Sequence, residues 1–206
     1  MVDADQTQCR PRMSDAGGQI TSLVERARDG DRTAFEQLVS LFQDSIFRMV
    51  YYRTRSRMDA EDLTQEVFIK AFENLSNLRD LERFRTWLFR MAVNRVRDFH
   101  RKKRVLAFLG TTKDDNEPDA VDMKIQDDPG ALDHIMRHEF WKQIKLLSNR
   151  LSRWEREVFF LRFMDHLNIR EIAQVLGKSE STVKTHLYRG LKKFREETTL
   201  LQLLEG

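Results

Sequence analysis

The chain has 206 residues, which is enough for one ordinary domain or two small ones. Three prolines and eight glycines are few, while Leu, Arg, Lys and Glu dominate, and this composition is typical of an all-helical protein. No apolar run approaches ~20 residues and the N-terminus lacks the apolar segment of a secretory signal, so we expect no membrane insertion and a cytoplasmic location. Cys9 is the only cysteine, which excludes an internal disulfide.

Charge is distributed unevenly along the chain. The net charge is only +3, but residues 95–104 and 178–195 are strongly basic, and residues 114–133 are strongly acidic. The small net charge therefore hides two basic patches with an acidic strip between them.

Helical periodicity predicts a first domain. Residues 1–18 show no periodicity, and we expect a disordered tail there. Four apolar stripes at helical spacing then begin at Ile20, Phe35, Leu63 and Phe84, and together they predict a four-helix domain over residues 19–104. Asp59 is expected to be the N-cap of the third helix.

The pattern stops over residues 105–131, which contain two glycines, two prolines and most of the acidic strip. We expect a flexible linker there and a second domain over residues 132–206. Two capping boxes, Ser152 with Glu155 and Asn168 with Glu171, predict helix starts in that domain. The expected fold is all-α, with two small helical domains joined by a flexible acidic linker.

The second domain has the features of a helix-turn-helix, from Trp154 to Glu196. A turn at Gly177 separates two helical stretches, and Leu176 and Val183 on either side of it are expected to pack together. With Val183 facing inward, the opposite face of the last helix is polar and basic, which suits a DNA major groove. That face and the helix start contain Ser179, Ser181, Thr182, Lys184, Thr185, Tyr188, Arg189 and Lys192. The alternatives are a helical hairpin whose basic face meets water and a protein-binding helix.

The third helix combines carboxylate, amide and aromatic groups on one side, which suits a protein partner. These groups are Asp62, Gln65, Glu66 and Lys70, with Phe68 and Phe72 beside them. An ordinary solvated face is the alternative.

The fourth helix is a candidate for binding single-stranded nucleic acid, because aromatic rings can stack on bases and cations can follow the backbone. The amide of Asn94 could hydrogen-bond a flipped-out base. The polar candidates are Arg90, Asn94, Arg97, Asp98, Arg101, Lys102, Lys103 and Arg104. Trp87 and Phe99 could instead be core residues. The helical spacing of Trp87 puts it on the inward stripe and favours this for Trp87.

Three segments in this order resemble a bacterial sigma factor of the extracytoplasmic-function (ECF) group. Asp59–Phe72 is similar to the family's core-polymerase-binding region, Phe84–Asp98 to its promoter-melting region, and Leu151–Glu196 to its second conserved domain. The resemblance covers nearly all of Ile20 to Glu197, and the chain departs from the family pattern in its N-terminal extension through Gly18.

The resemblance implies a role for each surface. Asp62, Gln65, Glu66 and Phe68 would bind the β′ clamp of core RNA polymerase, and the second domain would contact the β flap. The fourth-helix candidates would bind and melt the −10 element, with Asn94 capturing an unstacked base. The last-helix residues Ser181, Thr182, Lys184, Thr185, Tyr188, Arg189 and Lys192 would bind the −35 element of promoter DNA. The acidic linker would enter the RNA-exit path. An anti-sigma factor would hold the protein inactive until a stress or envelope signal.

Other functions are weaker interpretations of the same residues. A helix-turn-helix regulator that acts without replacing sigma is the nearest alternative, and a response regulator would need strand patterns that are missing. No phosphate-binding glycine loop or nucleophile motif indicates an enzyme. His134, His138 and Glu139 form at most a weak metal site, and a solvated face explains them better. We therefore expect no enzymatic activity, cofactor or metal.

Overall fold

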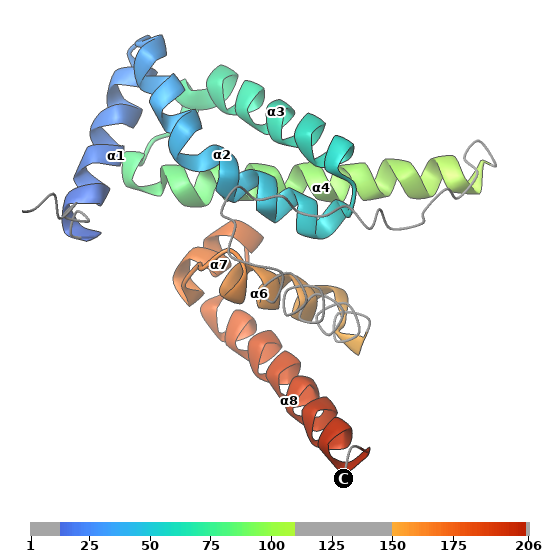
Figure 1. Ribbon diagram of the computed structural model, residues 1–206. Helices are drawn as coiled ribbons and strands as arrows, with labels where there is room; N and C mark the ends of the chain where they lie inside the picture. Colours follow the sequence, from blue (N-terminus) through green and yellow to red (C-terminus); the bar gives the residue numbers. More distant parts are fainter. Residues whose placement is uncertain (1–12, 110–149, 205–206) are drawn as a thin grey trace, which may run out of the picture.

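The computed structural model describes residues 13–109 and 150–204, and these two ranges are helical without a strand, as expected for an all-α chain (Figure 1). The elements are α1 (Met13–Arg28), α2 (Arg32–Thr54), α3 (Arg57–Asn74), the 3-10 turns η1 (Leu75–Asn77) and η2 (Leu81–Arg83), α4 (Phe84–Phe108), α6 (Arg153–Phe163), α7 (Ile169–Leu176) and α8 (Glu180–Leu204). Residues 110–149 lie outside the described ranges. They include most of the predicted linker, the start of the predicted second domain, and His134, His138 and Glu139.

The first domain is built by α1 to α4. α2 packs against α1 and α3, and α4 packs across α2 and α3. The four predicted apolar stripes face one another in its core, which is formed around fully buried residues such as Leu38, Met49, Phe84 and Phe89. Trp87 is partly buried and packs against this core, as its spacing indicated.

Three helix ends differ from the prediction. The prediction of Asp59 as the N-cap of α3 is wrong, because Ser56 occupies that position and its hydroxyl accepts the Asp59 backbone N–H at 3.3 Å. α1 begins at Met13, inside the predicted tail, and continues through Gly17 and Gly18. α4 ends at Phe108, beyond the predicted boundary at residue 104, and Leu106 and Ala107 in this extension are good helix formers.

The second domain is a helix-turn-helix. Both predicted capping boxes are present, one starting α6 and one starting α7. Gly177 ends α7 with a φ of 63°, a left-handed conformation that glycine adopts without strain. Leu176 and Val183 are both buried in one core, as expected from their positions around the turn. Phe194 of α8 is 42% exposed, and its ring centre lies 6.5 Å from that of Phe159 on α6.

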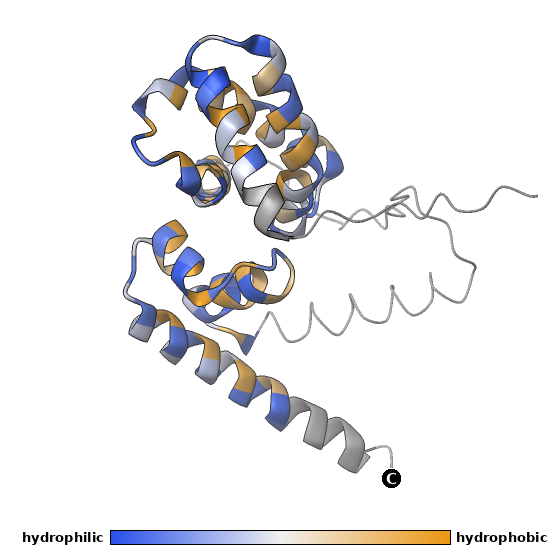
Figure 2. Ribbon diagram, turned by 90° about the vertical axis from the view of Figure 1, so that its left-hand side faces the viewer, coloured by the Kyte–Doolittle hydropathy of each residue, from blue (hydrophilic) through white to orange (hydrophobic). Residues whose placement is uncertain are grey.

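The two domains touch one another in this structure. α7 packs against α4, so the helix-turn-helix lies beneath the first domain and α8 points away from it (Figure 1). Figure 2 shows that hydrophobic residues lie mainly on the inner sides of the helices within each domain. The contact between the domains instead involves several charged side chains, which are described below.

Candidate nucleic-acid interface

The outward face of α8 is fully available to a ligand. Lys184, Arg189 and Tyr188 are exposed, and the Tyr188 ring is 70% accessible. The Thr185 hydroxyl donates to the Ser181 carbonyl at 2.9 Å, and Lys192 lies 3.9 Å from Glu196. Exposed ion pairs of this kind are weak, so these groups can exchange their partners for DNA at little cost.

Hydroxyl groups organise the start of α8. The Ser179 side-chain oxygen accepts the Thr182 backbone N–H at 3.2 Å, and it lies within 2.9 Å of the hydroxyls of Ser181 and Thr182. Ser179 therefore caps the helix, which leaves the Ser181 and Thr182 hydroxyls at an exposed helix N-terminus where phosphate binds well.

Glu155 and Lys193 fix the position of α8, and sequence reasoning did not single out this pair. Lys193 Nζ lies 2.7 Å from the buried Glu155 carboxylate and donates to the Arg150 carbonyl at 3.3 Å. Burial alone would raise the pKa of Glu155, but hydrogen bonds from Lys193 and Ser152 lower it below its ordinary value. Close packing adds to this, since a side chain at Gly190 would meet Leu151 Cδ2 at 3.7 Å.

The exposed surface of α4 contains most of the predicted −10 residues. Arg90, Asn94, Lys102 and Arg104 point into solvent, and Lys103 is partly covered. Asp98 pairs with Arg101 at 3.1 Å, within one turn of the helix. The surface thus offers an exposed amide beside a run of cations.

Arg97 is an exception among these residues, because the second domain covers it. Its guanidinium carbon lies 5.0 Å from the centre of the Trp154 ring, on α6. Burial lowers the pKa of Arg97, and among the described residues its Nε and one Nη atom have no hydrogen-bond partner. Trp154, which sequence analysis noted only as the start of the helix-turn-helix, also contacts Arg153 and Lys178, at 5.5 and 4.0 Å from its ring centre.

The predicted partner-binding residues of α3 do not all lie on its surface. Asp62 and Gln65 are exposed, and Glu66 forms an ion pair with Arg95 of α4. The expectation that Phe68 lies on the exposed face is wrong, because Phe68 is only 8% accessible. Its ring turns toward α2 and packs in the core that joins the two helices.

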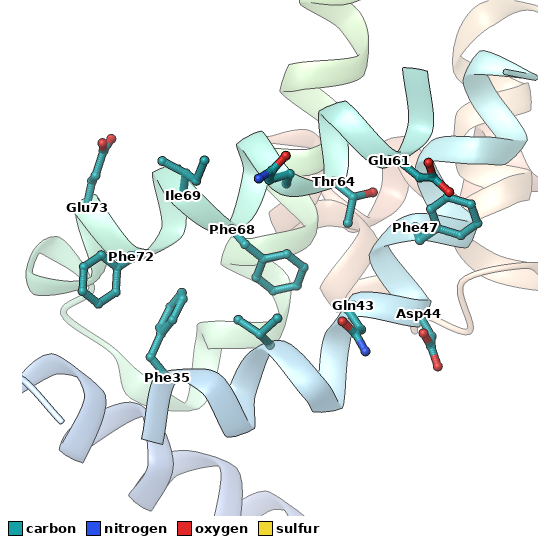
Figure 3. Close-up of a pocket in the computed structure, with 12 residues that line it drawn as sticks. Phe35, Gln43, Asp44, Phe47, Glu61, Thr64, Phe68, Ile69, Phe72 and Glu73 are labelled. Carbon is teal, nitrogen blue, oxygen red and sulfur yellow. The ribbon is translucent and has the colours of Figure 1, made fainter. Parts of the chain in front are cut away.

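A groove of about 890 Å³ runs between α2 and α3, and Phe68 forms part of its lining (Figure 3). Phe35, Phe47, Ile69 and Phe72 supply apolar surface, and the Phe35 and Phe72 rings meet edge to face at 5.0 Å. Ile69 and Phe72 are each about half exposed. Among the described residues, the lining includes the carboxylates of Asp44, Glu61 and Glu73 and no Lys or Arg. Such an apolar groove with charged edges suits a protein segment.

The described residues, 13–109 and 150–204, contain neither a metal-ligand cluster nor a membrane-spanning helix. In these ranges no group of three or more His, Cys, Asp and Glu side chains is arranged to hold a metal ion. No described helix is both long enough and apolar enough to cross a membrane.

This geometry defines a two-domain helical protein with a helix-turn-helix, a basic fourth helix and an apolar groove. Residues 38–105 match the sigma-70 region 2 family, and residues 141–194 match the sigma-70 region 4 family. The ECF RNA polymerase sigma factor SigW of Bacillus subtilis is 30% identical over 180 residues, which cover 86% of this chain and 96% of SigW. The ECF RNA polymerase sigma-E factor of Escherichia coli is 31% identical over 174 residues, which cover 81% and 87% of the two chains.

Solved structures support the same fold. The chain resembles CnrH in its complex with the cytosolic domain of CnrY, with a TM-score of 0.63, 22% identity, and coverage of 90% of this chain and 98% of CnrH. It also resembles RpoE of Bartonella quintana bound to the anti-sigma factor NepR, with a TM-score of 0.59, 20% identity, and coverage of 79% and 94%. The chain belongs to the ECF sigma factors of the sigma-70 family, and is therefore an RNA polymerase sigma factor.

Proposed function

We propose that this sigma factor selects promoters through two separate surfaces, α8 for the −35 element and α4 for the −10 element. The observation that supports this assignment best is the presence of one exposed basic surface on each of the two domains. A protein that recognised a single site would have no need for the second surface. We further propose that the residues between the domains, about 105–131, link the two surfaces, and that the protein acts in the cytoplasm and has no catalytic residues of its own.

The −35 assignment rests on the chemistry of the α8 face. Lys184 and Arg189 can donate to guanine edges or to phosphates, and Tyr188 and Thr185 offer hydroxyls beside them. The capped N-terminus of α8, with Ser181 and Thr182, suits a backbone phosphate. An α-helix with this face fits the major groove of duplex DNA.

The −10 assignment rests on Asn94 and the cations that follow it. The Asn94 amide has both a donor and an acceptor and is exposed, so it can pair with an unstacked base. Arg90, Arg101, Lys102 and Arg104 lie along the same helix and can bind the backbone of the separated strand. Together these groups favour melted over duplex DNA at this position.

The core-polymerase assignment rests on α3. Asp62 and Gln65 are exposed and Glu66 is half-buried beside Arg95, so polar contacts with the β′ clamp are available. Phe68 can take part only through the groove between α2 and α3, which its ring lines. On the second domain, the aromatic cluster of Phe159, Phe163 and Phe194 is partly exposed and offers an apolar surface for the β flap.

An anti-sigma factor is a further proposed partner. Two structures that share this fold contain a bound partner: CnrH is bound to CnrY, and RpoE is bound to the anti-sigma factor NepR. The groove between α2 and α3 and the basic α8 face give such a partner both apolar and polar contacts. Release from it would switch on a stress or envelope-response regulon.

Transcription with purified core polymerase tests the proposal. Core enzyme plus this chain should initiate at defined positions on genomic DNA of the source organism, and the chain alone should bind the same fragments weakly. Tight binding to a site by the chain alone, with no new transcripts from core enzyme, would instead support the regulator that does not replace sigma.

A further inference from the structure

We infer that the two domains hold each other in a closed arrangement that cannot occupy a promoter, and that buried charges around Arg53 stabilise this arrangement. The inference rests on the proposed assignment of the −10 and −35 surfaces. It adds a regulatory step within the chain itself, because the domains must separate before both surfaces can bind DNA.

The centre of the contact is the Arg53 cluster, which consists of Arg53 at the end of α2 with Glu157, Phe160 and Asp165 of the second domain. Arg53 Nη2 lies 2.8 Å from Glu157 Oε1 and 3.1 Å from Asp165 Oδ2. The side chains of Arg53 and Asp165 are only 5% and 2% accessible. Arg53 Nη1 also donates to the Met49 carbonyl at 2.7 Å, and its guanidinium lies 5.6 Å from the centre of the Phe160 ring. Arg53 Nε donates to Glu157 Oε1 at 2.9 Å, so every nitrogen of the guanidinium has a partner.

The charges in the Arg53 cluster depend on the contact between the domains. Burial alone would lower the pKa of Arg53, but the charges of Glu157 and Asp165 outweigh it and raise that pKa. Burial raises the pKa of Asp165 although Arg53 opposes this. Removal of one charged side chain of the Arg53 cluster would leave its partner's charge buried and uncompensated. Separation of the domains would return that charge to water.

A second contact lies on α4 and is closer to solvent. Arg85 Nη1 lies 2.8 Å from Glu171 Oε1 of α7, and Arg85 Nη2 donates to the Asp165 carbonyl at 3.3 Å. The Arg85 side chain is 37% accessible, so this pair contributes less than the Arg53 cluster. Its position on α4 means that α2 and α4 of the first domain are both bound to the second domain.

Closure covers Arg97, which belongs to the proposed −10 surface. Trp154 of α6 lies over its guanidinium, and two of the Arg97 nitrogens are buried without a hydrogen-bond partner among the described residues. Unpaired buried donors are costly, so Arg97 favours separation of the domains while the Arg53 cluster opposes it. The closed arrangement is therefore stable enough to form and can still be opened by a ligand.

The size of the closed molecule also prevents simultaneous binding to both elements. Elements centred at −35 and −10 lie roughly 70–85 Å apart on straight duplex, at about 3.4 Å per base pair. α4 has 25 residues and is therefore only ~38 Å long. The proposed −35 residues, 181–192, occupy only the first ~18 Å of α8, which follows α7 after a short turn. Because α7 packs on α4, these residues lie too close to α4 to reach the other element.

A distance measurement by pulsed electron paramagnetic resonance tests the inference. The full chain would have Cys9→Ser, and two spin labels would be attached through Ser40→Cys on α2 and Glu196→Cys on α8, both at exposed positions. We expect one short, narrow distance distribution for this parent chain. Arg53→Met should shift it to longer and broader distances, with the ratio of open to closed molecules raised about tenfold or more. Identical distributions in the parent and a folded Arg53→Met protein would overturn the inference.

Two further variants separate opening from misfolding. Arg85→Glu reverses the charge next to Glu171 and removes the hydrogen bond to the Asp165 carbonyl, but it leaves the side chains of the Arg53 cluster in place. It should open the chain partly even if Arg53→Met does not fold. Arg83→Glu is the matched control, because Arg83 is exposed and pairs with Asp80 within its own turn. It should leave the distance unchanged. If Arg83→Glu opened the chain as much as Arg85→Glu, the specific contacts would be irrelevant and the inference would be wrong.

Core polymerase supplies the functional arm of the test. Binding of core enzyme to the labelled parent chain should remove the short distance, and persistence of that distance in the bound complex would contradict the regulatory role. Gel filtration shows separately whether the chain binds core enzyme. Failure to bind would count against the proposed function, whereas the distances measured without polymerase would still decide whether the Arg53 cluster closes the chain.

Discussion

The two proposed DNA-binding surfaces differ in how ready they are for their ligand. On α8, Lys184, Tyr188 and Arg189 are exposed and their geometry is fixed by a cap and by the Glu155–Lys193 pair. On α4, Asn94 is exposed but Arg97 lies beneath Trp154 of the other domain. In the account proposed here, the duplex-binding surface is complete in the free protein, whereas the surface for melted DNA is completed only when the domains separate.

The largest effect is expected on the inner side of α4, where Phe89 is 1% accessible and lies directly before the exposed Arg90. Phe89→Ala should lower the free energy of unfolding of the first domain by about 3–5 kcal/mol, because it leaves a cavity in the core. Denaturant unfolding followed by circular dichroism measures this. Arg90→Ala is the control and should change stability little, and equal losses would mean that α4 is not oriented as described.

A smaller effect is expected on α8. Lys184→Ala and Arg189→Ala should each weaken recognition of the −35 element by about 1–3 kcal/mol if they contact base edges. Transcription from promoters with single −35 substitutions measures the loss of discrimination. A uniform loss over all −35 variants would show that the two side chains contact phosphates.

On the α4 surface, Asn94→Ala should slow promoter opening about tenfold, or about 1.4 kcal/mol, with little change in closed-complex binding. The physical reason is that the amide meets its base only after the base leaves the stack. Permanganate reactivity of unpaired thymines reports opening. Footprints that match the wild type in both rate and extent would remove Asn94 from this role.

The smallest effect concerns Glu155 and pH. Because the pKa of Glu155 is lowered in the folded chain, its stabilising contribution is complete above its ordinary value of 4.5 and is lost as pH falls through the lower folded value. Glu155→Gln retains a capping side chain but removes the charge next to Lys193, so it should cost about 1 kcal/mol at neutral pH. It should also flatten the decline of second-domain stability in acid. If the stability of the second domain fell as steeply in acid for Glu155→Gln as for the wild type, the decline would come from other carboxylates.

Local patterns explain why much of the fold was predictable. The apolar stripes, both capping boxes and the turn at Gly177 depend on residues within a few positions of one another, and all of them appear in the structure. The prediction for the α3 cap was wrong because Ser56 and Asp59 are both good capping residues, and only the path of the preceding turn distinguishes them. Phe68 was assigned to the surface because helical spacing does not show how closely α2 approaches.

The contacts between the domains could not be predicted from the sequence. Arg53 meets Glu157 and Asp165 from 104 and 112 positions away, and no periodic pattern links residues over such a distance. Trp154 looked like an ordinary helix-start residue, because the cation that it covers belongs to the other domain. The candidate surfaces were thus visible in the sequence, whereas the closure that joins them was visible only in the structure.

The most direct test of the account is run-off transcription with core polymerase on one mapped promoter and its variants. Templates with an altered −35 element, an altered −10 element or neither would be transcribed with the wild type, Arg189→Ala and Asn94→Ala. We predict that Arg189→Ala reduces discrimination at the −35 element only, and that Asn94→Ala reduces it at the −10 element only. Loss of discrimination at both elements by each variant, or no dependence of transcription on the chain, would contradict the assignment of two surfaces to two elements.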